Sequence, residues 1–327
     1  MALLTQWPTH RLPLDEERRK QALNAVNKAF ASAIANLQVD LGLEELFEKI
    51  YVPISCWVCE KHQPGKPLVV GINGAQGAGK ARLFNLLEVV LSEAFGLRVA
   101  NLSIDDVYLT RAEREHLALR VHPMLLTRGV PGTHDVELGL KLIRELKQAA
   151  EGDIVRIPMF DKSIDERTPE ESWQEFVGPV DVIVFDGWCI GARPEPDYRL
   201  GSPINELEAQ EDSDGRWRRY VNQQLAGPYQ RLFGELDLLI SLKVPNMKSV
   251  YNWRAAQEVK LSERTALRYE DRRPTDPLRI MGSDEIRRFI AHYERLTRWM
   301  LEDIPRIADL NLELNENHKI VAIKIKD

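Results

Sequence analysis

The sequence lacks the features of several large protein classes. No apolar run approaches the roughly 18 residues that span a bilayer, and the opening stretch, MALLTQWPTHRLPLDEERRK, lacks the basic-then-apolar order of a signal peptide. The Lys and Arg residues form no basic block and the formal net charge is -6, which argues against a general nucleic-acid binder. We therefore expect a cytoplasmic protein that acts on a small molecule, with no nucleic-acid or membrane partner. The oligomeric state is left open.

Cysteine is also scarce, with three residues among 327. Cys56 and Cys59 have C-x-x-C spacing with His62 nearby, which permits a redox or zinc interpretation. No second pair of ligands stands at zinc-finger spacing, so we expect small buried hydrophobic side chains instead. Cys189 follows a predicted strand and has no obvious partner in the sequence.

Short apolar runs alternate with amphipathic segments along most of the chain. The runs that predict strands are KPLVVGI (66–72), LRVANLSI (97–104), GDIVRIPMF (152–160), VDVIVFDGW (180–188) and LDLLISLKV (236–244). Strands that alternate with helices predict an α/β fold, an open and mostly parallel sheet with helices on both faces. The segment ADLNLELNENHKIVAIKIK (308–326) predicts a C-terminal β-hairpin.

Regions outside this alternation define the expected domain organisation. Helical spacing from residue 15 to about 62 predicts an N-terminal helical extension, residues 1–62, that covers a main domain of residues 63–327. Stretches rich in Pro, Gly and charged residues predict inserted loops near 193–216 and 262–283. Long loops beside a ligand-binding edge often form lids or substrate walls.

The string GINGAQGAGKAR (71–82) nearly matches the phosphate-binding pattern G-x-x-x-x-G-K-[ST]. It follows a predicted strand and opens a predicted helix, as the pattern requires, so backbone N–H groups and the helix N-terminus would surround phosphate oxygens. A P-loop NTPase-like fold is therefore expected, with a lysine on the β- and γ-phosphates. The nucleotide-binding candidates are Gly74, Ala75, Gln76, Gly77, Ala78, Gly79, Lys80, Ala81 and Arg82.

Acidic residues follow two of the predicted strands. Asp105 and Asp106 stand just beyond LRVANLSI, and Asp186 ends the apolar part of VDVIVFDGW. Ligands of parallel sheets bind at the carboxyl ends of the strands. Asp105 could take the proton of an attacking hydroxyl or hold Mg²⁺ through water, and Asp186 is placed like the acid that orients Mg²⁺ in phosphate-loop enzymes. An Asp at a strand end can equally cap the next helix.

The string RGVPGTHD (128–135) carries the candidates for substrate recognition. Arg128 could pair with a carboxylate or phosphate, and His134 and Asp135 could bond hydroxyls. A tight Pro-Gly turn followed by a helix cap would give the same string, so both interpretations stay open. Candidates for a lid cation on the phosphoryl group, which could also form a solvated helix face, are Lys243, Arg254 and Lys260.

Seven strings in order resemble the D-glycerate 3-kinase family, within the group of phosphate-loop kinases that includes uridine kinase, phosphoribulokinase and bacterial pantothenate kinase. They are GINGAQGAGK, LSIDDVYLT, RGVPGTHD, IPMFDKS, VIVFDGW, VYNWRAAQE and MGSDEIRRFI. The match runs from about Lys66 to the C-terminal hairpin, and residues 1–60 contribute nothing to it. The loop alone is common to many proteins, whereas RGVPGTHD together with W-R-x-x-Q-E is much more specific.

The resemblance implies transfer of the γ-phosphoryl group of ATP to a hydroxyl of D-glycerate with Mg²⁺. Lys80 and the loop would hold ATP, Asp105 would be the general base, and Asp186 would stand where the family commonly has Glu. Lys80, Asp105 and Asp186 are thus the catalytic candidates, and the two acids the metal candidates, through water. The substrate-binding candidates are Asp106, Tyr108, Arg128, His134, Asp135 and Arg254.

One departure from the family bears on activity. The family's loop reads G-K-S-T, but here Lys80 is followed by Ala81 and Arg82. The missing hydroxyl is a Mg²⁺ ligand in phosphate-loop enzymes, and water could take its position because Mg²⁺ keeps several waters. We therefore expect an active kinase with weaker metal binding; the alternative is a nucleotide-binding protein with little or no catalysis.

Overall fold

The computed structural model describes residues 47–268 and 281–326, together with scattered helical positions between residues 16 and 28. Most of the expected N-terminal extension, and residues 269–280 of the second expected insertion, lie outside the described residues.

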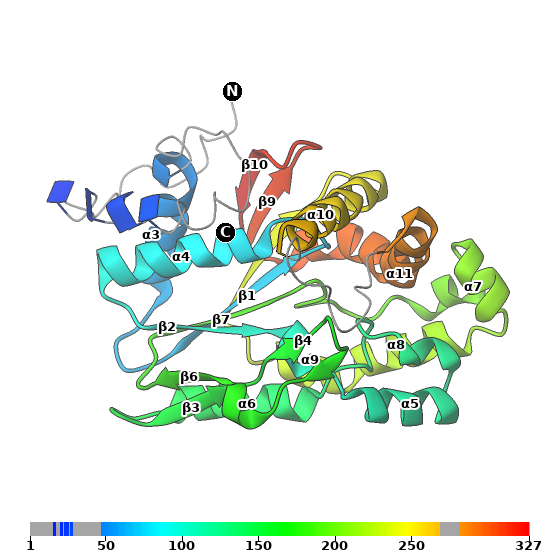
Figure 1. Ribbon diagram of the computed structural model, residues 1–327. Coiled ribbons are helices and arrows are strands. Elements are labelled where there is room, and N and C mark those ends of the chain that lie inside the picture. The colour runs from blue at the N-terminus through cyan, green and yellow to red at the C-terminus, as the bar shows by residue number, and fades with distance from the viewer. Residues whose placement is uncertain are drawn as a thin grey trace.

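A six-stranded sheet organises the described chain, with strand order β10-β9-β8-β1-β7-β2 (Figure 1). The five strands from β2 to β9 in this order run parallel to one another, and β10 pairs antiparallel with β9. The strands are β1 (Leu68–Gly74), β2 (Val99–Ser103), β7 (Val182–Gly187), β8 (Leu238–Lys243), β9 (Leu310–Leu314) and β10 (Ile320–Ile325). The expected parallel sheet and C-terminal hairpin are therefore confirmed.

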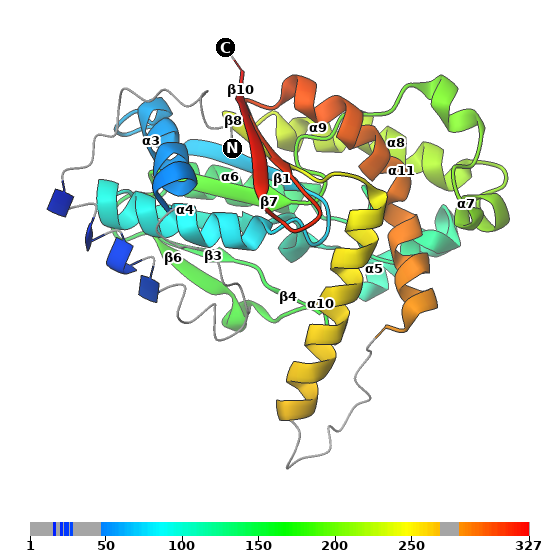
Figure 2. The same ribbon diagram turned by 90° about the horizontal axis from the view of Figure 1, so that it is seen from above.

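Helices cover both faces of this sheet. In Figure 1, α3 and α4 lie above it and α6 and α9 below it, and Figure 2 shows α10 crossing beside the β9–β10 hairpin. The helices are α3 (Val52–Lys61), α4 (Lys80–Phe95), α5 (Arg111–Arg120), α6 (Val136–Gln148), α7 (Glu206–Glu211), α8 (Arg216–Ala226), α9 (Pro228–Phe233), α10 (Met247–Arg268) and α11 (Ser283–Ile307). Short helical turns are η1 (Phe47–Tyr51), η2 (Ile104–Val107), η3 (Pro123–Leu126), η4 (Glu170–Ser172) and η5 (Asp197–Gly201).

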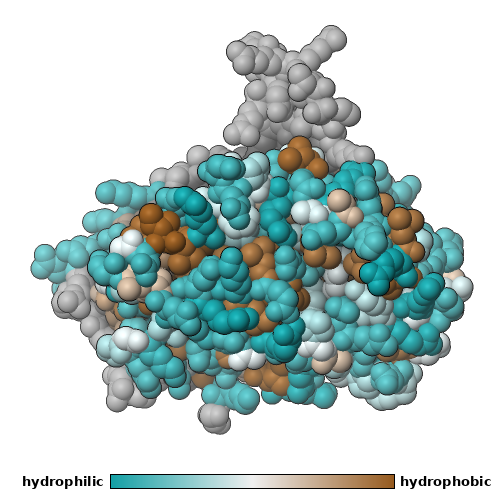
Figure 3. Space-filling view, turned by 90° about the horizontal axis from the view of Figure 1, so that it is seen from below, coloured by the Kyte–Doolittle hydropathy of each residue, from teal (hydrophilic) through white to brown (hydrophobic). Residues whose placement is uncertain are grey.

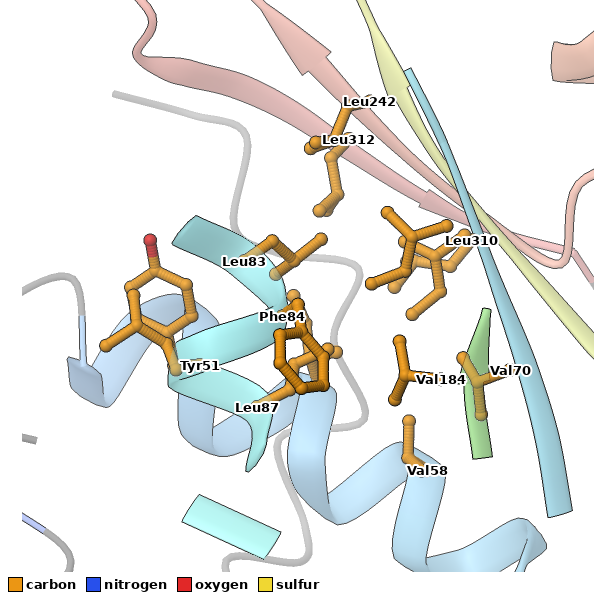
Figure 4. Packing of buried hydrophobic residues seen from close by; sticks show 14 of the residues in the cluster. Tyr51, Val58, Val70, Leu83, Phe84, Leu87, Val184, Leu242, Leu310 and Leu312 are labelled. Atoms are coloured by element: carbon orange, nitrogen blue, oxygen red, sulfur yellow. The ribbon is translucent and has the colours of Figure 1, made fainter. Parts of the chain in front are cut away.

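The upper core packs one face of α4 against the sheet. Leu83, Phe84 and Leu87 point from the helix toward Val184 of β7 and Val70 of β1 (Figure 4), and all five are buried. Apolar residues three and four apart place these side chains on one helix face. The packing fixes the start of α4 against the end of β1, where the Gly-rich string lies.

The end of the N-terminal extension joins the same core. η1 buries Ile50 and Tyr51, and α3 buries Ile54, Trp57 and Val58, in the cluster that holds α4 and the sheet. Within α3, Cys56 is buried and Cys59 half-buried, and both are free thiols, as is the buried Cys189. The expected division of the chain at residue 62 stays a prediction.

The string GDIVRIPMF forms strands outside the main sheet. Its first part, β3 (Ile154–Ile157), pairs antiparallel with β6 (Gln174–Val177), and its last part opens β4 (Phe160–Asp161), which pairs with β5 (Glu166–Arg167). The side chains of β3 alternate between exposed and buried, unlike those of a central strand. β3 and β6 lie low in Figure 1, and Figure 3 shows that underside as mostly hydrophilic with separate apolar spots.

The two expected insertions contain regular structure. Residues 193–216 include η5 and α7, and α7 packs against α11. Helix α10 continues to Arg268, so residues 262–268 are helical. No helix among the described residues is long and apolar enough to cross a membrane.

Candidate active site

The Gly-rich string forms a tight loop between β1 and α4. Gly77 and Gly79 have φ angles of 82° and 93°, which side chains rarely adopt, and a Cβ added to Gly77 would lie 2.7 Å from Trp253 Cβ. The ammonium of Lys80, at the start of α4, donates to the carbonyl oxygen of Gly74 (2.8 Å). The loop therefore brings backbone groups, a lysine and a helix N-terminus together, an arrangement that suits an anion.

The two residues after the lysine differ in their surroundings. Ala81 is exposed on the first turn of α4, and Arg82 is half-buried. The Arg82 guanidinium lies beside the loop, with Nη2 3.7 Å from the Cβ position of Gly79. Ala81 leaves no side-chain hydroxyl here, whereas Arg82 brings a cation near the glycine backbone.

The predicted acids lie at the carboxyl ends of neighbouring strands. β2 ends at Ser103 and leads into η2, which carries Asp105 and Asp106. Asp186 lies on β7, where it is opposite Ser103 of β2 on one side and opposite Ile72 of β1 on the other. Because β1 leads into the loop, parallel register brings the acids and the loop to one sheet edge.

Asp105 is held by two hydrogen bonds. Its Oδ2 accepts from Lys162 Nζ (2.6 Å) and its Oδ1 from the Tyr108 hydroxyl (2.8 Å). Burial acts to raise the pKa of Asp105, but the Lys162 and Lys80 ammonium groups and these hydrogen bonds outweigh it and hold that pKa at about 2. Asp105 is therefore ionised across the neutral range.

The neighbouring acids are shifted in the opposite direction. Burial raises the pKa of Asp186 to about 6, against the opposing charge of Lys80. Burial also raises the pKa of Asp106 to about 6, although its Oδ1 accepts from the backbone N–H of Phe160 (3.2 Å). Burial lowers the pKa of Lys80, while Asp186 and Asp105 act against that shift. The site thus gathers ionisable groups whose pKa values are shifted by burial and by neighbouring charges, a common property of functional sites.

His134 is buried beside these acids. Its ring stacks on Tyr108 (centroids 4.6 Å apart), and Nδ1 lies 2.5 Å from the Tyr229 hydroxyl. Burial lowers the pKa of His134 to about 4, so the ring is neutral at pH 7. Its Nε2 is buried and has no hydrogen-bond partner among the described residues.

The other residues of RGVPGTHD hold local structure. Arg128 forms an ion pair with Asp165, its guanidinium lies over the Phe160 ring (5.5 Å), and its Nη2 donates to the carbonyl oxygen of Lys162 (3.3 Å). Asp135 caps α6 by accepting from the backbone N–H of Leu138 (3.0 Å). The helix-cap interpretation therefore describes the geometry of Asp135.

Arg254 lies on α10 and pairs with Glu258 (2.7 Å) over the ring of Phe289. Both Arg254 and Arg128 act on the pKa of Tyr293, which burial raises, so Arg254 faces the same region. Lys243 instead pairs with Glu313 of the hairpin (3.3 Å), and the side chain of Lys260 lies outside the described residues.

Sequence reasoning missed two residues that contact the predicted site. Lys162, in the turn between β4 and β5, contacts Asp105. It lies in the string IPMFDKS, but no local pattern there indicates a functional role. Trp253 packs on Gly77, donates to the carbonyl oxygen of Glu316 (2.9 Å) and stacks on His318. It joins the loop, α10 and the hairpin, and the string VYNWRAAQE contains it.

A separate cavity of about 490 Å³ lies between α11, the segment with η5 and the start of α10. None of the candidate site residues lines it. The chemistry-bearing groups gather instead at the sheet edge after β1, β2 and β7.

Enzymes that move phosphoryl groups from ATP on an open parallel sheet use a lysine-bearing loop of this kind, with acidic side chains nearby to manage the metal and the acceptor proton. The fold and the edge of its sheet therefore define this chain as a phosphate-loop kinase.

The comparisons with known proteins give the same class. No family model matches the chain. An uncharacterized kinase of Schizosaccharomyces pombe is 30% identical over 243 residues, which cover 70% of this chain and 79% of that protein. The chloroplastic D-glycerate 3-kinase of Arabidopsis thaliana is 28% identical over 262 residues, 74% of this chain and 52% of that protein, so the match spans about half of the plant enzyme.

A solved structure agrees in fold. The D-glycerate 3-kinase from Cryptococcus neoformans superposes with a TM-score of 0.65 at 23% identity, covering 95% of this chain and 100% of that one. With these relatives, the chain belongs to the D-glycerate 3-kinase family of ATP-dependent phosphate-loop kinases.

Proposed function

We propose that the protein transfers the γ-phosphoryl group of ATP to a hydroxyl of D-glycerate or a similar small hydroxy acid. The observation that carries this proposal is the meeting of Lys80, Asp105 and Asp186 at one sheet edge. The kinship with D-glycerate 3-kinases supports the choice of acceptor.

The loop would bind the triphosphate. Lys80 would exchange its hydrogen bond to Gly74 for the β- and γ-phosphate oxygens, and the N–H groups of residues 74–82 would donate to the same oxygens. Arg82, beside Gly79, adds a positive charge at this end of the site.

Asp105 would act as the general base. The acceptor oxygen forms a bond to the γ-phosphorus, the bond from that phosphorus to the β–γ bridging oxygen breaks, and ADP leaves with those electrons. The proton of the acceptor hydroxyl passes to the Asp105 carboxylate. Proton transfer to a positioned base commonly contributes about 10²–10⁴-fold to a rate.

The residues present fit Mg²⁺. This ion typically takes one or two protein carboxylates and completes its shell with phosphate oxygens and water. Asp186 is a buried carboxyl whose pKa burial raises to about 6, so a cation would offset its desolvation. Asp105 and Asp186 would hold the ion through water, and the bound ion would neutralise charge on the transferring phosphoryl group.

The acceptor would lie against the residues around Asp105. The unpartnered Nε2 of neutral His134 offers a hydrogen bond to a hydroxyl, and Arg128 and Arg254 supply positive charge for a small acid. Asp135 would contribute to acceptor binding indirectly, because its carboxylate caps α6 and so holds the adjoining chain in place. The proposed substrate-binding set remains Asp106, Tyr108, Arg128, His134, Asp135 and Arg254.

A second candidate function rests on Ala81. Without the hydroxyl that usually follows the lysine, the protein would bind nucleotide and catalyse little or nothing. Tight ATP binding that needs no Mg²⁺ would favour this alternative.

The deciding experiment is ADP release from Mg·ATP with D-glycerate, compared with L-glycerate, pantothenate, uridine and ribulose 5-phosphate. Lys80→Ala is the negative control, because it removes the ammonium group proposed to bind the β- and γ-phosphates. Release that requires D-glycerate and vanishes in Lys80→Ala supports the kinase, whereas unchanged turnover in Lys80→Ala contradicts it. ATP binding without release for any acceptor favours the second candidate, and Ala81→Ser then shows whether the hydroxyl is responsible.

A further inference from the structure

Lys162 forms an ion pair with the proposed general base. Its Nζ lies 2.6 Å from Asp105 Oδ2, while the Tyr108 hydroxyl donates to the other carboxylate oxygen. A base that is in contact with an ammonium group is a poor proton acceptor. In the described arrangement, Asp105 is therefore masked.

Neighbouring side chains hold the backbone that carries Lys162, whereas its own side chain is exposed. Asp165, in the same turn, pairs with Arg128 and with buried Arg114 (2.9 Å), and Arg128 also donates to the carbonyl oxygen of Lys162. Arg167, at the end of the turn, donates to the carbonyl oxygen of Tyr108 (2.7 Å). The Lys162 side chain is 57% exposed, and lysine has a flexible stem that can redirect its charge.

Other cations at this edge have partners whose release would not affect the base. Arg128 is paired with Asp165, and Arg254 with Glu258. Lys162 instead pairs with Asp105, the group that must accept the proton. Ion pairs at this exposure are weak, so a carboxylate on the acceptor can compete for the ammonium.

We infer that Lys162 recognises the carboxylate of the acceptor and, by leaving Asp105, frees that residue to act as the base. This inference rests on the proposed function. The exchange replaces one carboxylate partner of the ammonium with another, and it leaves the Asp105 carboxylate with only the Tyr108 hydroxyl as its recorded side-chain donor, available to the acceptor's proton. Asp105 then takes the hydroxyl proton as the acceptor oxygen bonds to the γ-phosphorus and ADP departs.

Two consequences follow for selectivity. A neutral polyol has no carboxylate to draw Lys162 away, so it meets a masked base. Water meets the same masked base when the acceptor site is empty, which protects bound ATP from hydrolysis. Lys162 would thus set both the preference for an acid and the low rate of wasteful turnover.

The test compares Lys162→Met with wild type, using Lys324→Met as the matched control. Lys324 pairs with Glu313 at 2.7 Å and the two side chains are 60% and 25% exposed, close to 2.6 Å, 57% and 30% for Lys162 and Asp105. Lys324 lies on β10, at the opposite edge of the sheet from β2. Lys162→Arg tests whether a different cationic side chain at this position restores function. Lys162→Gln replaces Lys162→Met in the comparison if the methionine variant does not fold.

In Lys162→Met we expect KM for D-glycerate to rise at least tenfold while KM for glycerol stays within twofold. ADP release without acceptor should rise at least threefold, and the double variant with Asp105→Asn should lose that rise. Propionate, which is glycerate without its hydroxyls, should stimulate ADP release by wild type and not by Lys162→Met. Lys324→Met should match wild type in each assay.

The inference is overturned if Lys162→Met equals wild type in both KM for D-glycerate and release without acceptor. It is also overturned if the rise in release persists in the double variant. Failure of the proposed function has a different signature, in which wild type shows no D-glycerate-dependent release. In that case a rise in Lys162→Met that depends on Asp105, together with stimulation by propionate, still supports masking and points to another acid as acceptor.

Discussion

Replacing Gly77 with alanine measures how tightly the phosphate loop is packed against α10. Gly77 has a φ of 82°, and its added Cβ would lie 2.7 Å from Trp253 Cβ and 3.5 Å from the Trp253 carbonyl carbon. Trp253 cannot easily yield, because its indole N–H donates to Glu316 and its ring stacks on His318 at 4.0 Å.

The magnitude has two parts that can be separated. A left-handed backbone costs a residue with a Cβ about 1–2 kcal/mol, and overpacking typically costs about 1–3 kcal/mol. Gly65 provides the control, since its φ is 78° and a Cβ there would meet nothing within 4 Å. Gly65→Ala should therefore lose only the first part, and Gly77→Ala about 1–3 kcal/mol more.

Urea unfolding followed by circular dichroism gives both free energies of unfolding, and nucleotide titration gives ATP affinity. Because the loop or α10 must shift to admit the new methyl group, Gly77→Ala should also bind ATP at least tenfold more weakly, with Gly65→Ala unchanged. Equal losses of stability in the two variants, with equal ATP affinity, would show that Trp253 does not brace the loop.

Three further predictions concern the acids and the position after the lysine. Asp105→Asn should lower kcat by about 10²–10⁴-fold with little change in ATP affinity; weaker Mg·ATP binding with a smaller loss of rate would make Asp105 a metal-shell residue. Ala81→Ser should lower the Mg²⁺ concentration needed for half-maximal activity and raise turnover, because it restores a hydroxyl on the first turn of α4, where Ala81 is exposed. Steady-state titration with Mg²⁺ measures this, and no change would mean that water or Arg82 already compensates. Asp106→Asn should stabilise the ligand-free protein by about 1–3 kcal/mol at pH 8: the pKa of Asp106 is about 6 in the fold against 3.8 when unperturbed, so its contribution to stability is full below pH 3.8 and is lost as pH rises through 6. Unfolding curves at pH 4 and pH 8 check the sign, and an advantage for the variant at pH 4 as large as that at pH 8 would contradict it.

The central strands were predictable because strands that are buried on both faces have continuous apolar sequences. β1 and β7 are buried on both faces, so their sequences are continuous apolar runs, and the order of runs and helices gives the parallel sheet. GDIVRIPMF looked similar, but Arg156 interrupts it and its exposed positions alternate with buried ones. Its partner, Gln174–Val177, has no strong strand pattern, so the small sheet could not be read from the sequence.

The site was predictable where strand order places it. Asp105 follows β2 and Asp186 lies near the end of β7, and these parallel strands bring their carboxyl ends to the same edge as that of β1. Lys162 lies 57 residues from Asp105 in the chain and in a turn outside that sheet, so local patterns could not bring the two together. The same limit applies to Trp253, whose contact with Gly77 depends on how α10 crosses the loop.

The cations of the site share a property that bears on how substrates enter. In the described structure Lys80 donates to the Gly74 carbonyl, Lys162 pairs with Asp105, and Arg254 pairs with Glu258. Each has already lost part of its hydration to an internal partner, so under the proposed roles a phosphate or carboxylate would replace that partner rather than strip a fully hydrated ion. The released partners then differ in consequence: the Gly74 carbonyl and Glu258 have no proposed part in proton transfer, whereas Asp105 becomes a base. Binding of the acceptor, more than binding of ATP, is therefore the event that should switch the chemistry on.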